Sequence, residues 1–260
     1  MLDLDLARQQ LDESGWFVLP EFISADWLAE LQEATERQFQ IEGDRAGTEF
    51  RQEEGSRRLA NLVNKGEVFR RIVVEPTLLK LVGLVLPLGF KLSSLNARSA
   101  NPQNGVGQPL HSDMGAVADE HGFQVCNSVW MLNDFTEDNG PLRVVPGSHH
   151  IGKTPQQALD NPAEPHPDEV ILTGKAGTVI VMNAHSWHGG QMNRTDRPRT
   201  ALHAFFSRRD KPQQQYQKRL IDEDLQATFS PELREVLALD DPLNDDVTAN
   251  ADRKTGFLKG

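Results

Sequence analysis

The central part of the chain, from about residue 90 to residue 208, consists of short apolar segments separated by turn-forming residues. Segments such as FQVCNSVWML and TVIVMN are rich in β-branched and aromatic residues. The stretches between them, such as NPQNGVGQP and TEDNGP, concentrate Gly, Pro, Asn and Asp. Several short strands with turn signals between them are typical of an all-β sandwich or barrel. The sequence therefore predicts a mainly β fold with its barrel core over about residues 90–208.

Helical signals lie outside this region. GWFVLPEF reads as a strand that ends at a proline, and Ser24 then stands where a helix N-cap is expected. A second helix is predicted from Pro76, a favoured first-turn residue, to about Leu86. A third is predicted within SPELREVLAL, with Ser230 as its N-cap.

These signals predict one domain over residues 1–260. Its parts are a helical N-terminal support over about 1–90, the barrel core over about 90–208 and a helical or irregular C-terminal segment over about 209–260. At 260 residues the chain has the length of one large domain.

Charge and cysteine content exclude several classes of function. The formal net charge of -11 disfavours nucleic acid or an anionic membrane as a partner, because both require a basic surface. The single cysteine, Cys126, rules out an intrachain disulfide and a cysteine-based zinc cluster, as expected of a cytoplasmic protein. The longest apolar run, near residues 78–90, contains a lysine and a proline and is too short for a membrane span.

Two motifs carry candidate metal ligands. In QPLHSDMG, His111 and Asp113 are two residues apart, and on an extended strand both side chains would point the same way. In GTVIVMNAHSWHGG, an apolar strand runs into His185 and His188. Two histidines and one carboxylate form the facial triad that suits non-haem Fe(II), although zinc also accepts such ligands. The residues alone therefore leave the metal open.

Taken in order, HSD, NDFTEDNGPLRVVPGSHH and HSWHGGQMNRTDRPRTAL resemble the phytanoyl-CoA dioxygenase-like branch of the Fe(II)/2-oxoglutarate oxygenases. The resemblance extends from GWFVLPEF to about residue 208. It implies a double-stranded β-helix, which is a cupin-like jelly-roll barrel, flanked here by N- and C-terminal α-helices. It also implies Fe(II), 2-oxoglutarate and O2 as co-reactants.

The resemblance assigns roles position by position. His111 and Asp113 match the family's HxD ligands, and His188 matches its distal histidine, because it directly precedes the glycine turn. His185 is the rival for the third ligand. Arg199 matches the arginine that binds the far carboxylate of 2-oxoglutarate, a task suited to a guanidinium fork.

Arg194 and Arg197 compete with Arg199 for this role, and we interpret them as solvated charges of the turn. If Arg199 faces the barrel interior, His203 does so too by strand alternation. His203 is then either a pocket residue or a hydrogen-bonded core histidine.

Some positions depart from the family pattern. Several relatives carry a serine that helps to bind 2-oxoglutarate where Gly190 stands here, and Thr178 or Asn127 is a candidate to replace it. Candidate contacts for 2-oxoglutarate or substrate near the barrel mouth are Gln108, Arg98 and Asn96.

The implied reaction is hydroxylation of an unactivated carbon of a small organic metabolite, with decarboxylation of 2-oxoglutarate to succinate. Halogenases of this type lack the carboxylate ligand, so Asp113 favours hydroxylation. Two alternatives remain at this point: a cupin-like metal-dependent isomerase or hydrolase, and a non-catalytic barrel that binds a small ligand. The sequence has no pattern that predicts an oligomeric state.

Overall fold

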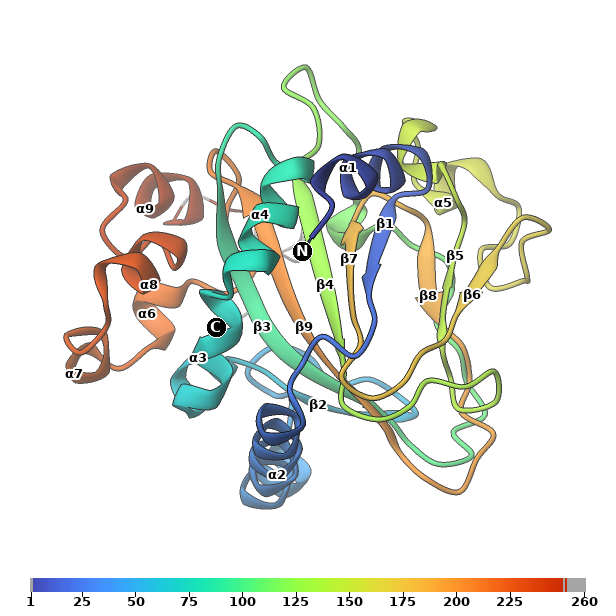
Figure 1. Cartoon of the computed structure of the whole chain (residues 1–260), viewed down its shortest axis with the longest axis horizontal. Helices are drawn as coiled ribbons and strands as arrows, with labels where there is room; N and C mark the ends of the chain where they lie inside the picture. Colours follow the sequence, from blue (N-terminus) through green and yellow to red (C-terminus); the bar gives the residue numbers. More distant parts are fainter. Residues whose placement is uncertain (1, 250, 252–260) are drawn as a thin grey trace.

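Two antiparallel sheets form the centre of the protein, as Figure 1 shows for this computed structural model, which describes residues 2–249 and 251. The larger sheet has the strand order β1-β7-β4-β9-β3-β2 and the smaller has the order β6-β5-β8. The strands are β1 (Trp16–Leu19), β2 (Ser56–Leu59), β3 (Phe90–Ala100), β4 (Val125–Met131), β5 (Leu142–Val144), β6 (Val170–Leu172), β7 (Val179–Asn183), β8 (His188–Gly190) and β9 (Arg199–Arg208).

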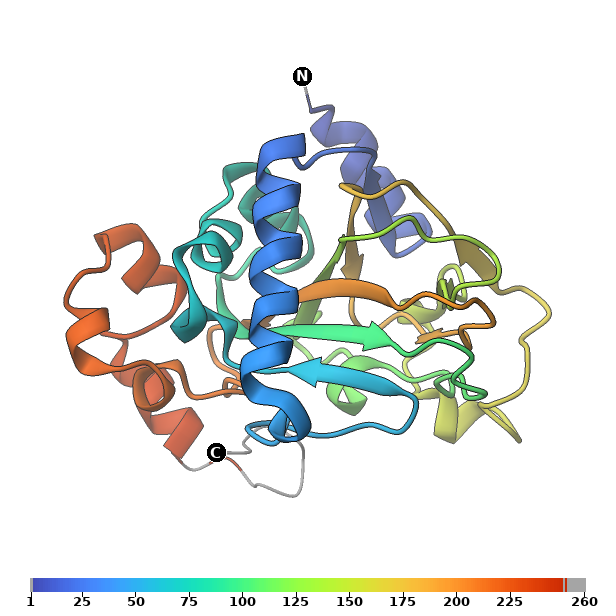
Figure 2. The same cartoon turned by 90° about the horizontal axis from the view of Figure 1, so that it is seen from below.

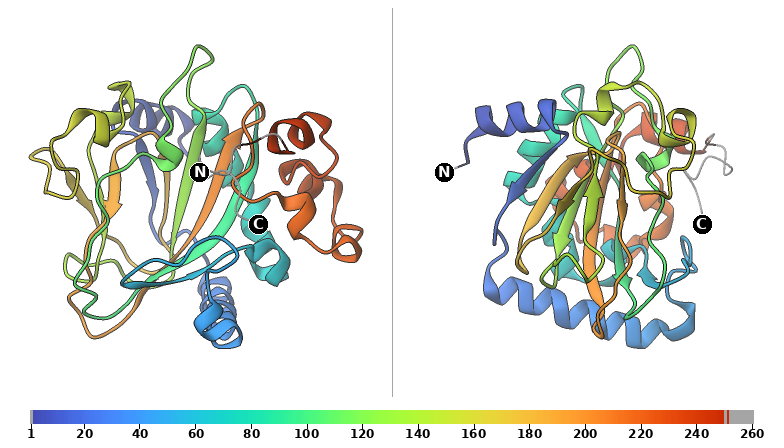
Figure 3. Two further views of the ribbon diagram at one scale, coloured as in Figure 1. Left: turned by 180° about the vertical axis from the view of Figure 1, so that it is seen from behind. Right: turned by 90° about the vertical axis from the view of Figure 1, so that its right-hand side faces the viewer.

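The helices lie outside this pair of sheets. They are α1 (Leu4–Glu13), α2 (Ala25–Glu42), α3 (Glu67–Val73), α4 (Pro76–Val85), α5 (Pro155–Ala158), α6 (Gln217–Leu220), α7 (Glu223–Gln226), α8 (Pro231–Val236) and α9 (Pro242–Ala249). The C-terminal helices α6–α9 gather beyond β3, on the side away from the smaller sheet (Figure 1). Helix α2 runs across one end of the larger sheet (Figures 2 and 3).

Strand alternation separates the two faces of the larger sheet. In β4, Cys126 and Trp130 join the apolar cluster on the helix-covered face, whereas Val129 and Met131 join the cluster between the sheets. Asn127 has the same parity as Val129 and therefore faces the inter-sheet space. The period-2 pattern that predicted strands thus also decides which polar side chains enter the interior.

Strands β3 and β9 follow the same rule and supply several of the polar residues of the interior. Their pairing has a register shift between Leu92 and Ser94, a β-bulge that places Ser94 and the residues of its parity on the inner face. Leu95 and Ala97 pack under the helices, while Asn96 lines the interior cavity.

The helix caps that the sequence predicted are confirmed. The hydroxyl of Ser24 accepts a hydrogen bond from the Trp27 N–H at the start of α2, and Ser230 does the same for Leu233 in α8. Pro76 is the first residue of α4. Each cap satisfies an N–H group that the first helical turn leaves without a partner.

Two predictions about elements need correction. The N-terminal region supplies β1 and β2 as well as helices, so it builds both edges of the larger sheet rather than only supporting it. HSWHGG does not end the strand that precedes it, because β7 stops at Asn183 in the larger sheet and β8 starts at His188 in the smaller one. A turn closed by the Ser186 N–H and the Asn183 carbonyl makes the crossing.

The C-terminal segment, predicted as helical or irregular, contains the short helices α6–α9 joined by turns and loops, and residues 250 and 252–260 lie outside the described residues. Within residues 2–249 and 251, no helix combines the length and the hydropathy needed to cross a membrane.

Candidate active site

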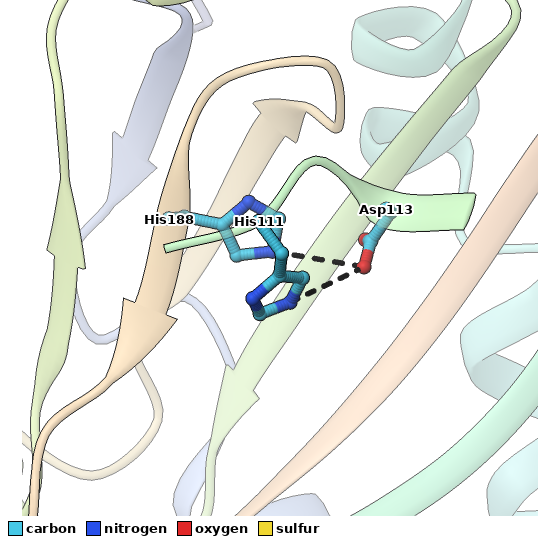
Figure 4. A group of neighbouring side chains, drawn as sticks. All are labelled: His111, Asp113 and His188. Atoms are coloured by element: carbon cyan, nitrogen blue, oxygen red, sulfur yellow. Dashed lines mark ion pairs between the residues drawn. The ribbon is translucent and has the colours of Figure 1, made fainter. Parts of the chain in front are cut away.

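His111, Asp113 and His188 converge at the entrance to the inter-sheet space (Figure 4). Their nearest ligand atoms all lie within 4.8 Å of one another. The Nε2 atoms of His111 and His188 lie 3.8 Å and 3.7 Å from Oδ1 of Asp113. Two imidazole nitrogens and one carboxylate oxygen at these separations can share one metal ion.

The backbone around these residues differs from the predicted strand. His111 forms only an isolated antiparallel bridge to His188, and Asp113–Gly115 is a 3-10 turn. Ser112 between them is extended, with φ -93° and ψ 143°, so His111 and Asp113 still point to the same side. The predicted convergence is therefore present, although the segment is a bridge followed by a turn.

Hydrogen bonds orient both imidazoles toward the centre of the triad. Nδ1 of His111 lies 2.9 Å from the Pro109 carbonyl oxygen, and Nδ1 of His188 lies 2.8 Å from that of Ser186. Because a carbonyl only accepts, each Nδ1 carries the proton and each Nε2 presents a lone pair to the centre. Burial, with a contribution from nearby His188, lowers the pKa of His111 to about 4, which keeps its ring neutral at pH 7.

Asp113 is held by Asn127 on the inner face of β4. The Asn127 Nδ2–H donates to Oδ2 of Asp113 over 2.8 Å, which leaves Oδ1 toward the histidines. Burial by itself would raise the pKa of the Asp113 carboxyl, but His188, His111 and the Asn127 hydrogen bond outweigh it and lower that pKa. The site therefore favours a carboxylate that is ready to bind a cation.

A cavity of about 730 Å³ opens beside the triad. Its polar lining includes most of the residues predicted to bind cosubstrate or substrate, namely Asn96, Arg98, Gln108, Asn127, Arg199 and His203. Thr178 does not belong to this lining. Its hydroxyl accepts a hydrogen bond from the Glu21 N–H at the far end of β7, so the prediction that Thr178 contacts 2-oxoglutarate is wrong.

Arg199 is 3% exposed and lines this cavity. Its guanidinium stacks on the Phe135 ring at 4.3 Å and donates from Nη2 to the Gly140 carbonyl, while Nε is buried without a hydrogen-bond partner. Burial lowers the pKa of Arg199 to about 9, so the group is still charged at pH 7. A buried cation with an orphaned donor is the arrangement that an anionic ligand would complete.

Gly190 explains how a second arginine reaches the same region. A Cβ atom at this position would lie 3.1 Å from Nη1 of Arg98 and 3.2 Å from Oε1 of Gln108, which accepts from the Gly190 N–H. The glycine therefore leaves room for the Arg98 and Gln108 side chains.

The rival residues lie apart from this site. His185 is buried behind it, with Nδ1–H donating to Oδ1 of Asn183 and Nε2 accepting from the Gln124 N–H. Both of its ring nitrogens thus have partners in the protein. Arg194 and Arg197 are exposed, as the sequence predicted.

His203 has no such partner for one of its nitrogens. Its Nε2 is buried without a hydrogen bond at the cavity wall. Burial, reinforced by the charge of Arg58, lowers the pKa of His203 to about 3, so the ring is neutral. This favours a pocket residue over a hydrogen-bonded core histidine.

Sequence reasoning expected residues around 45–65 to shape the pocket but did not single out Glu53 and Arg58, which line the cavity. Glu53 lies in a loop before β2, and nothing in the local sequence marks it as inward-facing. SRRL does contain two arginines of opposite strand parity, so one of them had to face inward if the segment was a strand.

Most of the chain matches one known protein family. The phytanoyl-CoA dioxygenase (PhyH) model matches residues 11–201, which include all three residues of the triad and Arg199. The chain belongs to this family. The prediction of an iron- and 2-oxoglutarate-dependent dioxygenase is thereby confirmed at the level of the family.

The chain is similar to a dioxygenase, a hydroxylase and a solved structure. The chain is 29% identical to the dioxygenase af480 of Aspergillus fumigatus, over 92% of this chain and 78% of that protein. It is 27% identical to an L-proline trans-4-hydroxylase of Streptomyces griseoviridis, over 78% of this chain and 85% of that protein. Among solved structures, the apoform of EctD from S. alaskensis has a TM-score of 0.67 at 25% identity and covers 80% of this chain and 78% of its own.

Proposed function

We propose that the protein is an Fe(II)/2-oxoglutarate-dependent dioxygenase that hydroxylates an unactivated carbon of a small polar metabolite. The observation that carries the proposal is the pairing of a His-Asp-His triad with a buried, incompletely bonded arginine in one cavity. A metal-dependent isomerase or hydrolase would use the triad but would have no need of Arg199. A non-catalytic barrel would need neither.

The residues of the site fit both Fe(II) and 2-oxoglutarate. His111, Asp113 and His188 would hold iron through Nε2, Oδ1 and Nε2, the atoms that the surrounding hydrogen bonds leave free. Arg199 would hold the far carboxylate of 2-oxoglutarate, since its Nε lacks a partner in the protein. When bound, iron(II) and 2-oxoglutarate supply the O2-activating chemistry, in which 2-oxoglutarate is oxidatively decarboxylated to succinate.

The protein's own groups determine position and charge. The carbonyls of Pro109 and Ser186 fix the tautomers of the two histidines, and Asn127 fixes the carboxylate. Phe135 supports the Arg199 guanidinium from one face and excludes water from it. Neutral His203 offers one uncharged hydrogen-bonding nitrogen to a substrate in the cavity.

We also infer that the two sheets are the halves of a double-stranded β-helix and that residues 1–260 form one domain. The sheet order supports this, because the chain alternates between the sheets after β4, passing through β5 and β6, then β7, β8 and β9. Such alternation lets both sheets contribute side chains to the space between them.

Anaerobic titration with Fe(II) and 2-oxoglutarate tests the proposal. We expect a weak visible charge-transfer band when both are present, and we expect Arg199→Gln to need at least about tenfold more 2-oxoglutarate, since a buried charge-assisted contact is worth more than 1.4 kcal/mol. Arg197→Gln, two residues away and exposed, is the matched control and should titrate like the unmodified protein. The absence of a band in the unmodified protein, or equal titration of both variants, would contradict the proposal.

A further inference from the structure

Two arginines face each other directly on the inner side of the larger sheet. Arg58 in β2 and Arg98 in β3 are register partners, and they are 8% and 4% exposed. Like charges directly opposite on neighbouring strands repel each other. Arg57, the residue next to Arg58, faces the other way, where it pairs with Glu36 and stacks on Phe39.

Glu53 bridges the two inward guanidinium groups. Its Oε1 accepts from Nε and Nη2 of Arg98 at 3.1 Å and 2.8 Å, and its Oε2 accepts from Nε and Nη2 of Arg58. Gln108 also donates to Oε1 over 3.1 Å. Burial would raise the pKa of Glu53, but the two arginines lower it to about 2, so the bridge is a carboxylate.

A contribution to protein stability does not readily explain why this Arg-Glu-Arg cluster is present. Buried ion triads can often be replaced by apolar residues of similar volume without loss of stability, because desolvation offsets their attraction. Glu53 uses the Nε and Nη2 atoms of both arginines, and each guanidinium has a further pair of N–H donors on Nη1. Nη1 of Arg98 lies beside Gly190, which places it next to the Arg199 site.

The charges around the cavity do not balance. Its lining includes four arginines, at positions 51, 58, 98 and 199, and three carboxylates, at positions 53, 54 and 113. Iron(II) and the 2-oxoglutarate dianion would cancel each other, so they would leave the excess of one positive charge unchanged. Within a protein of net charge -11, this is a local cationic site.

We infer that the substrate is a monoanion whose carboxylate binds the Arg58–Arg98 pair beside Glu53. This deepens the proposed function and rests on it. A carboxylate would supply the missing negative charge and accept from the remaining guanidinium donors. The polar inner row of β3 above the pair, with Ser94 donating to Gln214 and Asn96 accepting from Gln215, suits a small polar body better than a long apolar chain.

The test compares acids with their uncharged amides on the protein loaded with Fe(II) and 2-oxoglutarate under anaerobic conditions. The probes are benzoate with benzamide, hexanoate with hexanamide and lactate with lactamide, each read by the shift of the visible band and by succinate release after O2 is admitted. We expect the acids that bind to do so at least about tenfold more tightly than their amides, as a partly buried charge contact requires.

Two substitutions in the cluster should act in opposite directions. Arg58→Gln removes the excess charge, so the preference for acids over amides should fall at least about tenfold. Glu53→Gln adds to the excess, so that preference should rise. A merely structural role would weaken binding in both variants. Arg57→Gln, on the outer face, is the matched control and should leave the preference unchanged.

The outcomes separate the two proposals. If the unmodified protein forms no charge-transfer band, the proposed function fails. If the band forms but amides bind as tightly as acids, if no acid binds, or if both cluster variants shift the preference in the same direction, the substrate inference fails alone. Should Glu53→Gln not fold, Arg58→Gln with its control still decides the result.

Discussion

At the scale of single residues, the site depends on which atoms are already bonded. The same imidazole ring is a free ligand in His188 and a structural group in His185, because Nε2 is open in the first and accepts from the Gln124 N–H in the second. These two residues are three positions apart in the sequence. His188 was predicted to be the third metal ligand because the glycine turn directly follows it. The hydrogen bonds give the physical reason for that choice.

Asn127→Ala should weaken the metal site specifically. The change removes the hydrogen bond to Oδ2 of Asp113, and loss of such a support for a metal ligand typically costs about 10- to 100-fold in metal affinity. Fe(II) affinity measured by anaerobic competition with a chelator checks this. Ser128→Ala, next in sequence but bonded to the Ala204 carbonyl on the other face, should leave Fe(II) affinity unchanged. Equal affinity in Asn127→Ala and the unmodified protein would remove Asn127 from the site.

At the scale of elements, a turn far from the site in sequence supports the β7–β8 crossing. Gly15, between α1 and β1, has φ +98°, and its carbonyl accepts from the Asn183 N–H at the end of β7. A Cβ on Gly15 would lie 2.3 Å from Oγ of Ser186 and 3.0 Å from Nδ1 of His149. The N-terminal strand therefore packs directly behind the segment that delivers His188.

Gly15→Ala should destabilise the protein more than Gly122→Ala does. Both positions have strongly positive φ, so each alanine costs roughly 1–2 kcal/mol of backbone strain. Only Gly15 adds a steric clash, since nothing lies within 4 Å of a Cβ on Gly122, and overpacking typically costs a further 1–3 kcal/mol. Urea unfolding of the two variants measures the difference. Equal free energies of unfolding for the two variants would show that the β7–β8 crossing accommodates the added methyl group without loss of stability.

At the scale of the whole molecule, buried neutral histidines make the stability of the fold depend on pH. His149 and His185 are each 3% exposed, and burial lowers the pKa of each to about 4, with smaller contributions from His150 and His149 respectively. The unfolded chain binds protons near pH 6.5 at these positions, whereas the folded chain does not. Their contribution to stability is therefore full above about pH 6.5 and is lost as the pH falls toward 4.

We expect the free energy of unfolding of the metal-free protein to fall by up to about 1.4 kcal/mol per pH unit for each of these two histidines between pH 6.5 and pH 4. Urea unfolding at a series of pH values checks the slope. His185→Gln should reduce this slope by the contribution of one proton bound on unfolding. His121→Gln, at an exposed position, should leave the slope unchanged. A slope that His185→Gln leaves intact would mean that His185 is charged in the folded protein.

The sequence by itself determined whatever depends on local pattern. Period-2 alternation predicted the strands and the inward direction of His203, which has the same parity as Arg199. The caps at Ser24 and Ser230 followed from the first turn of each helix. Histidine, aspartate and arginine types in ordered motifs predicted the triad and Arg199, because their chemistry is specific to metal and carboxylate binding.

Only the tertiary structure decided which long-range pairs form. Glu53 meets Arg98 across 45 positions of sequence and Asn127 meets Asp113 across 14, so no local pattern marks either contact. The chain crosses from one sheet to the other between β7 and β8, and Thr178 lies outside the cavity, bonded to Glu21. Both features depend on strands that pair across long stretches of the chain. Local alternation fixes the direction of a side chain, whereas its partner is fixed by how the sheets assemble around the cavity.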